Sequence, residues 1–81
     1  MSHINEAVNV NSFYFAGQKG RMFPRQIQLG DEQYDFQEGL QYIVKKGQRV
    51  VKFFDMSDGN KTYRIACEDG NWTLTHYGTV P

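Results

Sequence analysis

The sequence predicts an all-β fold: a five- to six-stranded antiparallel meander that closes into a small barrel of the SH3-like or OB-like kind. Three observations support this prediction. Aromatic residues make up 15% of the 81 residues, and such side chains suit a pleated, half-buried sheet surface. From residue 17 onward, glycines beside polar residues divide the chain into segments of strand length. Short turns at these glycines place apolar side chains on one consistent face.

Residues 1–11 lack this alternation, so we expect a flexible N-terminal tail there and a single small barrel domain over residues 12–81. Phe13 and Phe15 fit a short initial strand at the start of that domain. The meander itself is expected to end near Tyr77.

Five turns define the hairpins in chain order. We interpret Gly30-Asp31, Gly47-Gln48 and Asp69-Gly70 as two-residue loops, and residues 37–39 and 57–59 as three-residue loops. Loop length determines which residues lie opposite each other, so these turns set the register. The pairs expected on one face are Ile27 with Tyr34, Tyr34 with Tyr42, Phe36 with Leu40, Tyr42 with Phe53, Val44 with Val51, Phe53 with Tyr63, Val51 with Ile65, Tyr63 with His76, Ile65 with Leu74 and Cys67 with Trp72.

One apolar face therefore continues through all five hairpins. Because no helix is expected to cover it, the sheet must close on itself or find a partner. Barrel closure is the first choice, and dimerisation through an open face or edge is the second. The predicted core consists of Phe23, Ile27, Leu29, Tyr34, Phe36, Leu40, Tyr42, Val44, Val51, Phe53, Tyr63, Ile65, Cys67, Trp72 and Leu74. The opposite face of the last two strands carries Arg64, Ala66, Thr73 and Thr75.

Composition narrows the classes of function. Nine basic and nine acidic residues give a formal net charge of zero, so no global field attracts nucleic acid or an anionic membrane. Cys67 is the only cysteine, which excludes an internal disulfide framework and favours a reducing, cytoplasmic setting. No segment is apolar over the length that spans a bilayer, and no secretory signal is visible. We expect a cytoplasmic protein that does not insert in a membrane.

No group of residues in the sequence predicts catalysis. Cys67 and His76 share the expected inner face but lie well apart on it, so Cys67 is interpreted as a buried structural thiol. The histidines and the cysteine lack the spacing of a metal site. Asp55 is expected at a strand end, where it reaches solvent or pairs with a nearby cation. We therefore expect no enzyme activity, metal, cofactor or small-molecule substrate.

The outer face of the central strands carries the candidate binding residues. In the expected register Lys52 lies opposite Arg64, beside an exposed Phe54. Cations interleaved with an aromatic side chain are how small barrels hold single-stranded nucleic acid. Alternatively, Ile43, Val50 and Phe54 form an apolar patch for a protein, with the charges as its rim. The candidate site residues are Ile43, Lys45, Val50, Lys52, Phe54 and Arg64.

These patterns predict a small non-catalytic binding module whose partner is another protein or a second copy of the chain. Binding of single-stranded nucleic acid is the alternative. A third interpretation is that the basic residues only solvate the sheet face and protect it from aggregation. If the apolar patch is the site, a charged residue in place of Phe54 abolishes association with little loss of folding.

Overall fold

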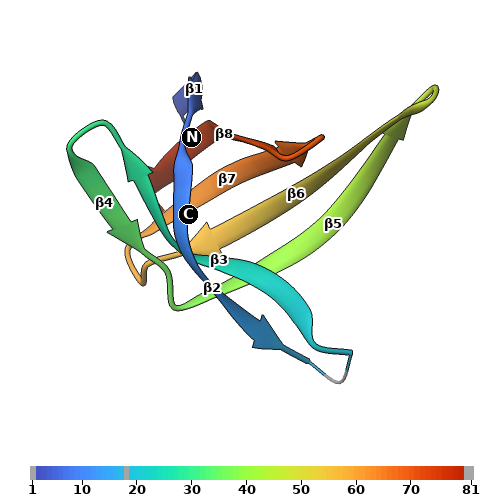
Figure 1. The fold of residues 1–81 in the computed structure, drawn as a ribbon. Coiled ribbons are helices and arrows are strands. Elements are labelled where there is room, and N and C mark those ends of the chain that lie inside the picture. The colour runs from blue at the N-terminus through green and yellow to red at the C-terminus, as the bar shows by residue number, and fades with distance from the viewer. Residues whose placement is uncertain (1, 18, 80–81) are drawn as a thin grey trace.

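In the computed structural model, residues 2–17 and 19–79 are described, apart from the side chains of residues 2 and 3. Residue 1 of the expected tail and residues 18, 80 and 81 of the expected domain lie outside this description. Within the described residues, eight strands follow one another (Figure 1): β1 (Ser2–Ala7), β2 (Asn9–Ala16), β3 (Arg21–Leu29), β4 (Glu32–Asp35), β5 (Glu38–Lys46), β6 (Arg49–Ser57), β7 (Lys61–Glu68) and β8 (Asn71–Thr79).

The strands form two antiparallel sheets. One has five strands in the order β1-β8-β7-β6-β5, and the other has three in the order β2-β3-β4. The all-β, antiparallel fold class is thus confirmed. Neither sheet closes on itself within residues 2–17 and 19–79, so the predicted barrel closure is not confirmed.

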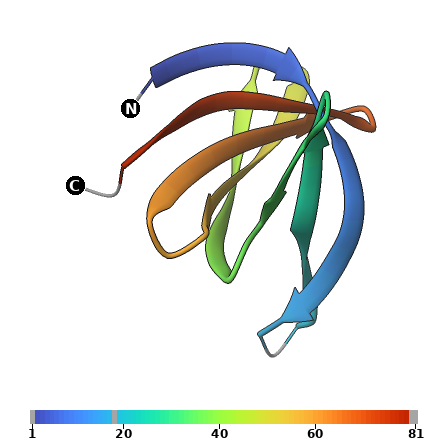
Figure 2. The ribbon, with the colours of Figure 1, turned by 90° about the vertical axis from the view of Figure 1, so that its left-hand side faces the viewer.

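The expected N-terminal tail is wrong, because strands occupy this segment. β1 pairs with β8, which brings the two ends of the described chain side by side (Figure 2). Ile4, Val8 and Val10 pack into or against the core, and their even spacing is that of a strand with one buried face. Between β1 and β2, the Val8 amide donates a hydrogen bond to the Trp72 carbonyl at 3.0 Å. The chain bends there from the five-stranded sheet into the three-stranded one.

A second bend lies between β4 and β5. The Phe36 amide donates to the Arg25 carbonyl of the three-stranded sheet, at 2.8 Å. The next amide, of Gln37, donates to the Ser57 carbonyl of the five-stranded sheet, also at 2.8 Å. Consecutive amides thus bond to different sheets, and β4 does not pair with β5. The predicted pairs of Tyr34 with Tyr42 and Phe36 with Leu40 are therefore wrong.

Three predicted turns are confirmed as two-residue loops: Gly30-Asp31, Gly47-Gln48 and Asp69-Gly70. The last has φ of 53° at Asp69 and 80° at Gly70, as the hairpin turns that match strand twist require. The pairs confirmed with these turns are Ile27 with Tyr34, Tyr42 with Phe53, Val44 with Val51, Ile65 with Leu74 and Cys67 with Trp72.

A register shift in the β7–β8 pair changes the face of one predicted residue. Between the pairs Ile65–Leu74 and Arg64–His76, β8 contains one extra residue, Thr75. His76 therefore lies opposite Arg64 instead of Tyr63, which pairs with Tyr77. An extra residue of this kind reverses the faces that follow it. Cys67 and His76 consequently do not share a face, contrary to the sequence interpretation.

The connection between β6 and β7 is longer than predicted. Ser57 pairs with Thr62, so four residues, 58–61, separate the last paired residues, where the prediction had the three residues 57–59. The Asp58 carboxylate accepts hydrogen bonds from the amides of Asn60 and Lys61 at 2.8 and 2.7 Å, which closes the turn on itself. Its second oxygen accepts a hydrogen bond from the Tyr63 hydroxyl at 3.1 Å.

This loop reverses the faces of the β5–β6 hairpin relative to the prediction. Tyr63 lies opposite Met56, three residues further along β6 than the predicted Phe53. An odd shift turns every side chain of the hairpin to the other side. The predicted pairs Phe53 with Tyr63 and Val51 with Ile65 are therefore wrong, and Phe54 and Met56 enter the core.

We call the side of the five-stranded sheet that carries Phe54, Met56 and Ile65 the core face, because the three-stranded sheet packs against it. The opposite side is the groove face. Predicted core residues on β5 lie on the groove face, and Leu40 is 71% exposed there. The buried core cluster consists of Val8, Phe23, Ile27, Phe36, Phe54, Met56, Tyr63, Ile65 and Leu74, with Leu29, Tyr34, Cys67 and Trp72 partly buried against it.

Gly39 of β5 lies where the buried Met56 side chain leaves no room for a Cβ atom. A Cβ atom at Gly39 would overlap the Sδ atom of Met56, which is fully buried, and would lie 3.0 Å from the Asp55 carbonyl oxygen. We expect Gly39→Ala to lower the free energy of unfolding by about 1–3 kcal/mol through overpacking. Urea denaturation measures the loss.

The control for this prediction is the Met56→Ala background, which removes the overlapping side chain. There, Gly39→Ala should cost clearly less than in the wild type. An equal cost in both backgrounds would contradict the packing explanation.

Stability at high pH should depend on Tyr63. Burial and the hydrogen bond to Asp58 raise the pKa of Tyr63 from 10.0 to about 12. The folded state therefore favours the protonated phenol, so this contribution is complete below pH 10 and is lost as the pH rises toward about 12. Tyr63→Phe should flatten the fall in unfolding free energy over that interval, measured by urea titrations. Some dependence should remain, because the pKa of Tyr34 is also raised to about 12. An unchanged slope would show that Tyr63 is not responsible.

Candidate functional site

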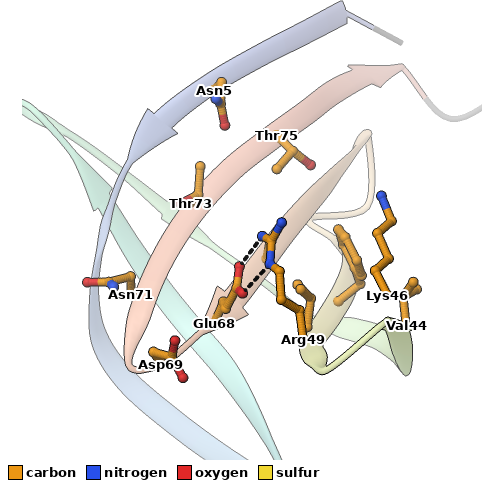
Figure 3. Close-up of a pocket in the computed structure, with 12 residues that line it drawn as sticks. Asn5, Val44, Lys46, Arg49, Glu68, Asp69, Asn71, Thr73 and Thr75 are labelled. Atoms are coloured by element: carbon orange, nitrogen blue, oxygen red, sulfur yellow. Dashed lines mark hydrogen bonds and ion pairs between the residues drawn. The ribbon is translucent and has the colours of Figure 1, made fainter.

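A groove of about 460 Å³ runs over the groove face of the five-stranded sheet (Figure 3). Its apolar floor consists of Val44, Val51, Phe53 and Ala66. Its polar lining consists of Asn5, Lys46, Arg49, Glu68, Asp69, Asn71, Thr73 and Thr75.

The groove exists because the sheet curls. Its lining includes Asn5 on β1 and Val44 on β5, the two edge strands of the sheet. Four interstrand steps separate these edges, or roughly 19 Å across a flat sheet. Residues of both edge strands line the same groove, so the sheet is bent around it; Figure 3 labels Asn5 and Val44 among these residues.

The charges of the groove balance. Lys46 and Arg49 contribute two positive charges, and Glu68 and Asp69 contribute two negative ones. Arg49 binds Glu68 through two hydrogen bonds, 2.8 Å from Nε and 2.7 Å from Nη2. This contact raises the pKa of Arg49 and lowers that of Glu68. A groove without net charge, lined by amides and hydroxyls that both donate and accept, suits a polar neutral chain better than a polyanion.

A second ion pair stands further along the groove face. Arg64 donates from Nε to Asp55 at 2.8 Å and from Nη2 at 3.2 Å. The two side chains are 34% and 22% exposed. Of the two alternatives expected for Asp55, solvent or a nearby cation, the structure shows the cation. The hydrogen bond to Asp55 raises the pKa of Arg64.

Five of the six candidate binding residues share one face, but it is the core face. Val50, Lys52 and Phe54 alternate along β6, and Ile43 and Lys45 lie directly opposite on β5. Ile43 is 55% and Val50 is 50% exposed. Phe54 is 1% exposed and lies in the core.

Arg64 is separated from this group. It lies on the groove face opposite Asp55, and Lys52 lies opposite Cys67 instead. The predicted juxtaposition of Lys52 and Arg64 is therefore wrong. With Phe54 buried as well, the basic and aromatic strip required for single-stranded nucleic acid is not assembled.

The sequence allowed an open sheet edge without assigning it to a strand, and the structure places a free edge along β5. Among the four edge strands, β4 has four residues, and the pairing of β1 and of β2 is interrupted by register shifts. β5 has nine residues in unbroken register with β6 and contains no proline. Its Leu40 and Ile43 side chains are more than half exposed on opposite faces. Natural sheets usually protect such an edge with bulges, proline or shortness.

Cys67 is a free, partly buried cysteine. Burial raises the pKa of the Cys67 thiol, which disfavours the reactive thiolate. In the described part of the chain, no group of three or more His, Cys, Asp or Glu side chains could hold a metal ion. That part also contains no helix long and apolar enough to cross a membrane.

Comparison of the chain with protein-family models, with curated proteins and with solved structures gives no match.

Burial changes what substitution of Phe54 is expected to do. The Phe54 ring contacts Trp72 at 5.3 Å and Phe23 at 6.1 Å between ring centroids. Phe54→Lys should lower the free energy of unfolding by roughly 3–5 kcal/mol. Val50→Lys, on the same strand and face but half exposed, should cost less than about 1 kcal/mol. Urea denaturation of both variants tests the assignment of faces. Similar losses for the two would contradict it.

Proposed function

We propose that this chain is a small non-catalytic binding module that associates with another polypeptide by adding a strand to the free edge of β5. The observation that carries the proposal is the length, regularity and exposure of this edge. An edge strand presents a row of unpaired amide and carbonyl groups that an extended peptide can satisfy.

The properties of the groove face favour a polypeptide as the partner. Val44 and Lys46 of β5 line the groove, so alternate side chains of an added strand would continue the groove face beyond β5. The balanced charge and the mixed donors and acceptors of the lining suit peptide groups. On the core face, the exposed Ile43 and Val50 offer apolar contact to the intervening side chains.

The proposal also covers the architecture of the domain and its cellular location. We regard the two sheets, joined by bends at Val8 and at residues 36–37, as a small SH3-like or OB-like barrel that stays open along β5. A cytoplasmic setting is part of the proposal, because the single cysteine is unsuited to a disulfide framework.

Proline substitution tests the proposal. The two-residue loop makes Lys46 and Arg49 a hydrogen-bonded pair, so alternation directs the Ile43 amide away from β6, toward the free edge. Ile43→Pro therefore blocks an incoming strand without removing a bond to β6. The matched control is Gln33→Pro, at the equivalent outward position on the free edge of β4.

The probe is a displayed library of random peptides of about twelve residues, long enough to span β5. Peptides selected on the wild type should bind Ile43→Pro at least about tenfold more weakly and Gln33→Pro equally well. Peptides that bind all three proteins equally, or a library that yields no binder, would overturn the proposal.

A further inference from the structure

We propose that the strand received by the β5 edge is β5 of a second copy, paired antiparallel about a two-fold axis at Tyr42. This inference rests on the proposed function and specifies its partner and register. Three properties of the strand support it: the direction of its backbone groups, the match of its side chains and the placement of its charges.

The backbone groups on the free edge are compatible with this pairing. Because Lys46 and Arg49 form a hydrogen-bonded pair, the backbone groups of every second residue of β5 bond to β6. The amide and carbonyl groups of the residues between them point toward the free edge. With the axis at Tyr42, each outward residue meets an outward residue of the second copy. On the order of eight hydrogen bonds then form. The outward residues are Gly39, Gln41, Ile43 and Lys45. In each copy, Gly39 lies opposite Lys45 of the other copy, and Gln41 lies opposite Ile43 of the other copy.

The same register matches apolar side chains on the groove face. Leu40, which is 71% exposed, lies opposite Val44 of the second copy. Tyr42 lies opposite its own counterpart, and it already stacks on Phe53 with centroids 5.4 Å apart and planes at 14°. Pairing therefore joins two stacked ring pairs across the axis, where close cross-strand aromatic contacts add stability.

The charges at the ends of β5 favour this pairing register over the registers next to it. Glu38 lies at one end of β5 and Lys46 at the other, both exposed and on the same face. With the axis at Tyr42, each Glu38 lies opposite Lys46 of the other copy, which places an opposite-charge pair at both ends. Moving the axis to residue 41 places Glu38 opposite Val44, and moving it to residue 43 places Leu40 opposite Lys46. In both cases a charged side chain then faces an apolar one. The central register also uses all nine residues of the strand.

Sedimentation equilibrium of the purified chain tests the inference. The range should extend from about 10 µM to about 1 mM, because an interface of one strand pair is small and gives a weak complex. We expect a monomer that becomes a dimer over this range. Glu38→Lys and Lys46→Glu should each weaken dimerisation about tenfold, since both ends then carry like charges. The double variant Glu38→Lys/Lys46→Glu should restore it.

Lys45→Glu is the matched control, because it makes the same charge change opposite Gly39 of the second copy; its effect should stay within about twofold. Tyr42→Cys in a Cys67→Ala background should form an intermolecular disulfide, since residues at the axis have Cα atoms about 4.5 Å apart. Leu40→Cys should not, because its counterpart lies roughly 13 Å along the strand.

A chain that stays monomeric throughout the range, or a dimer that ignores both charge reversals, would overturn the inference. The proposed function fails separately: if the chain is monomeric but selected peptides still distinguish Ile43→Pro from Gln33→Pro, the β5 edge takes a different polypeptide. A dimer with the double-reversal rescue and the Tyr42→Cys cross-link supports the second copy as the partner.

Discussion

The closed turn at Asp58 decides which side of the β5–β6 hairpin faces the core. Its carboxylate accepts hydrogen bonds from the amides of Asn60 and Lys61, and four residues therefore separate the paired residues Ser57 and Thr62. Because strand side chains alternate, this loop length places Phe54 and Met56 in the core. Backbone and tyrosine donors to the carboxylate lower the pKa of Asp58, as expected when hydrogen bonds favour its charged form. The core, the groove and the exposure of β5 all follow from this register.

The core and the groove are the two faces of the same curled sheet. Val51 and Phe53 of β6 and Ala66 of β7 point to the side opposite Phe54 and Ile65 and form part of the floor of the groove. The β5–β6 hairpin extends beyond the three-stranded sheet, so Ile43 and Val50 remain half exposed although they lie on the core face. Lys45 and Lys46 at its tip are the kind of charge that limits uncontrolled edge pairing. Residues 39–44 of β5 carry no charge, which is why we interpret this edge as a binding surface.

Local signals predicted local structure well. Turns such as Asp69-Gly70 specify both loop length and pairing, and the hairpins they close are confirmed. The faces of β5 and β6 were harder to predict, because residues 57–61 accommodate loops of three or four residues. The two loop lengths place opposite faces of the hairpin toward the core. β1 was missed because its partner, β8, lies at the far end of the chain and no turn joins them. The predicted geometry of the candidate site is wrong because of the same loop: the reversed hairpin buries Phe54 and separates Lys52 from Arg64.

Residue-resolved amide hydrogen exchange tests the open β5 edge most directly. In dilute solution, we expect slow exchange at amides bonded to β6 and fast exchange at those between them, with the fast amides becoming protected at high concentration. The slow set is Leu40, Tyr42 and Val44, and the fast set is Gln41, Ile43 and Lys45. Protection of the second set at every concentration would show that the chain already covers this edge. Equally fast exchange in both sets would show that the β5–β6 hairpin does not have this register.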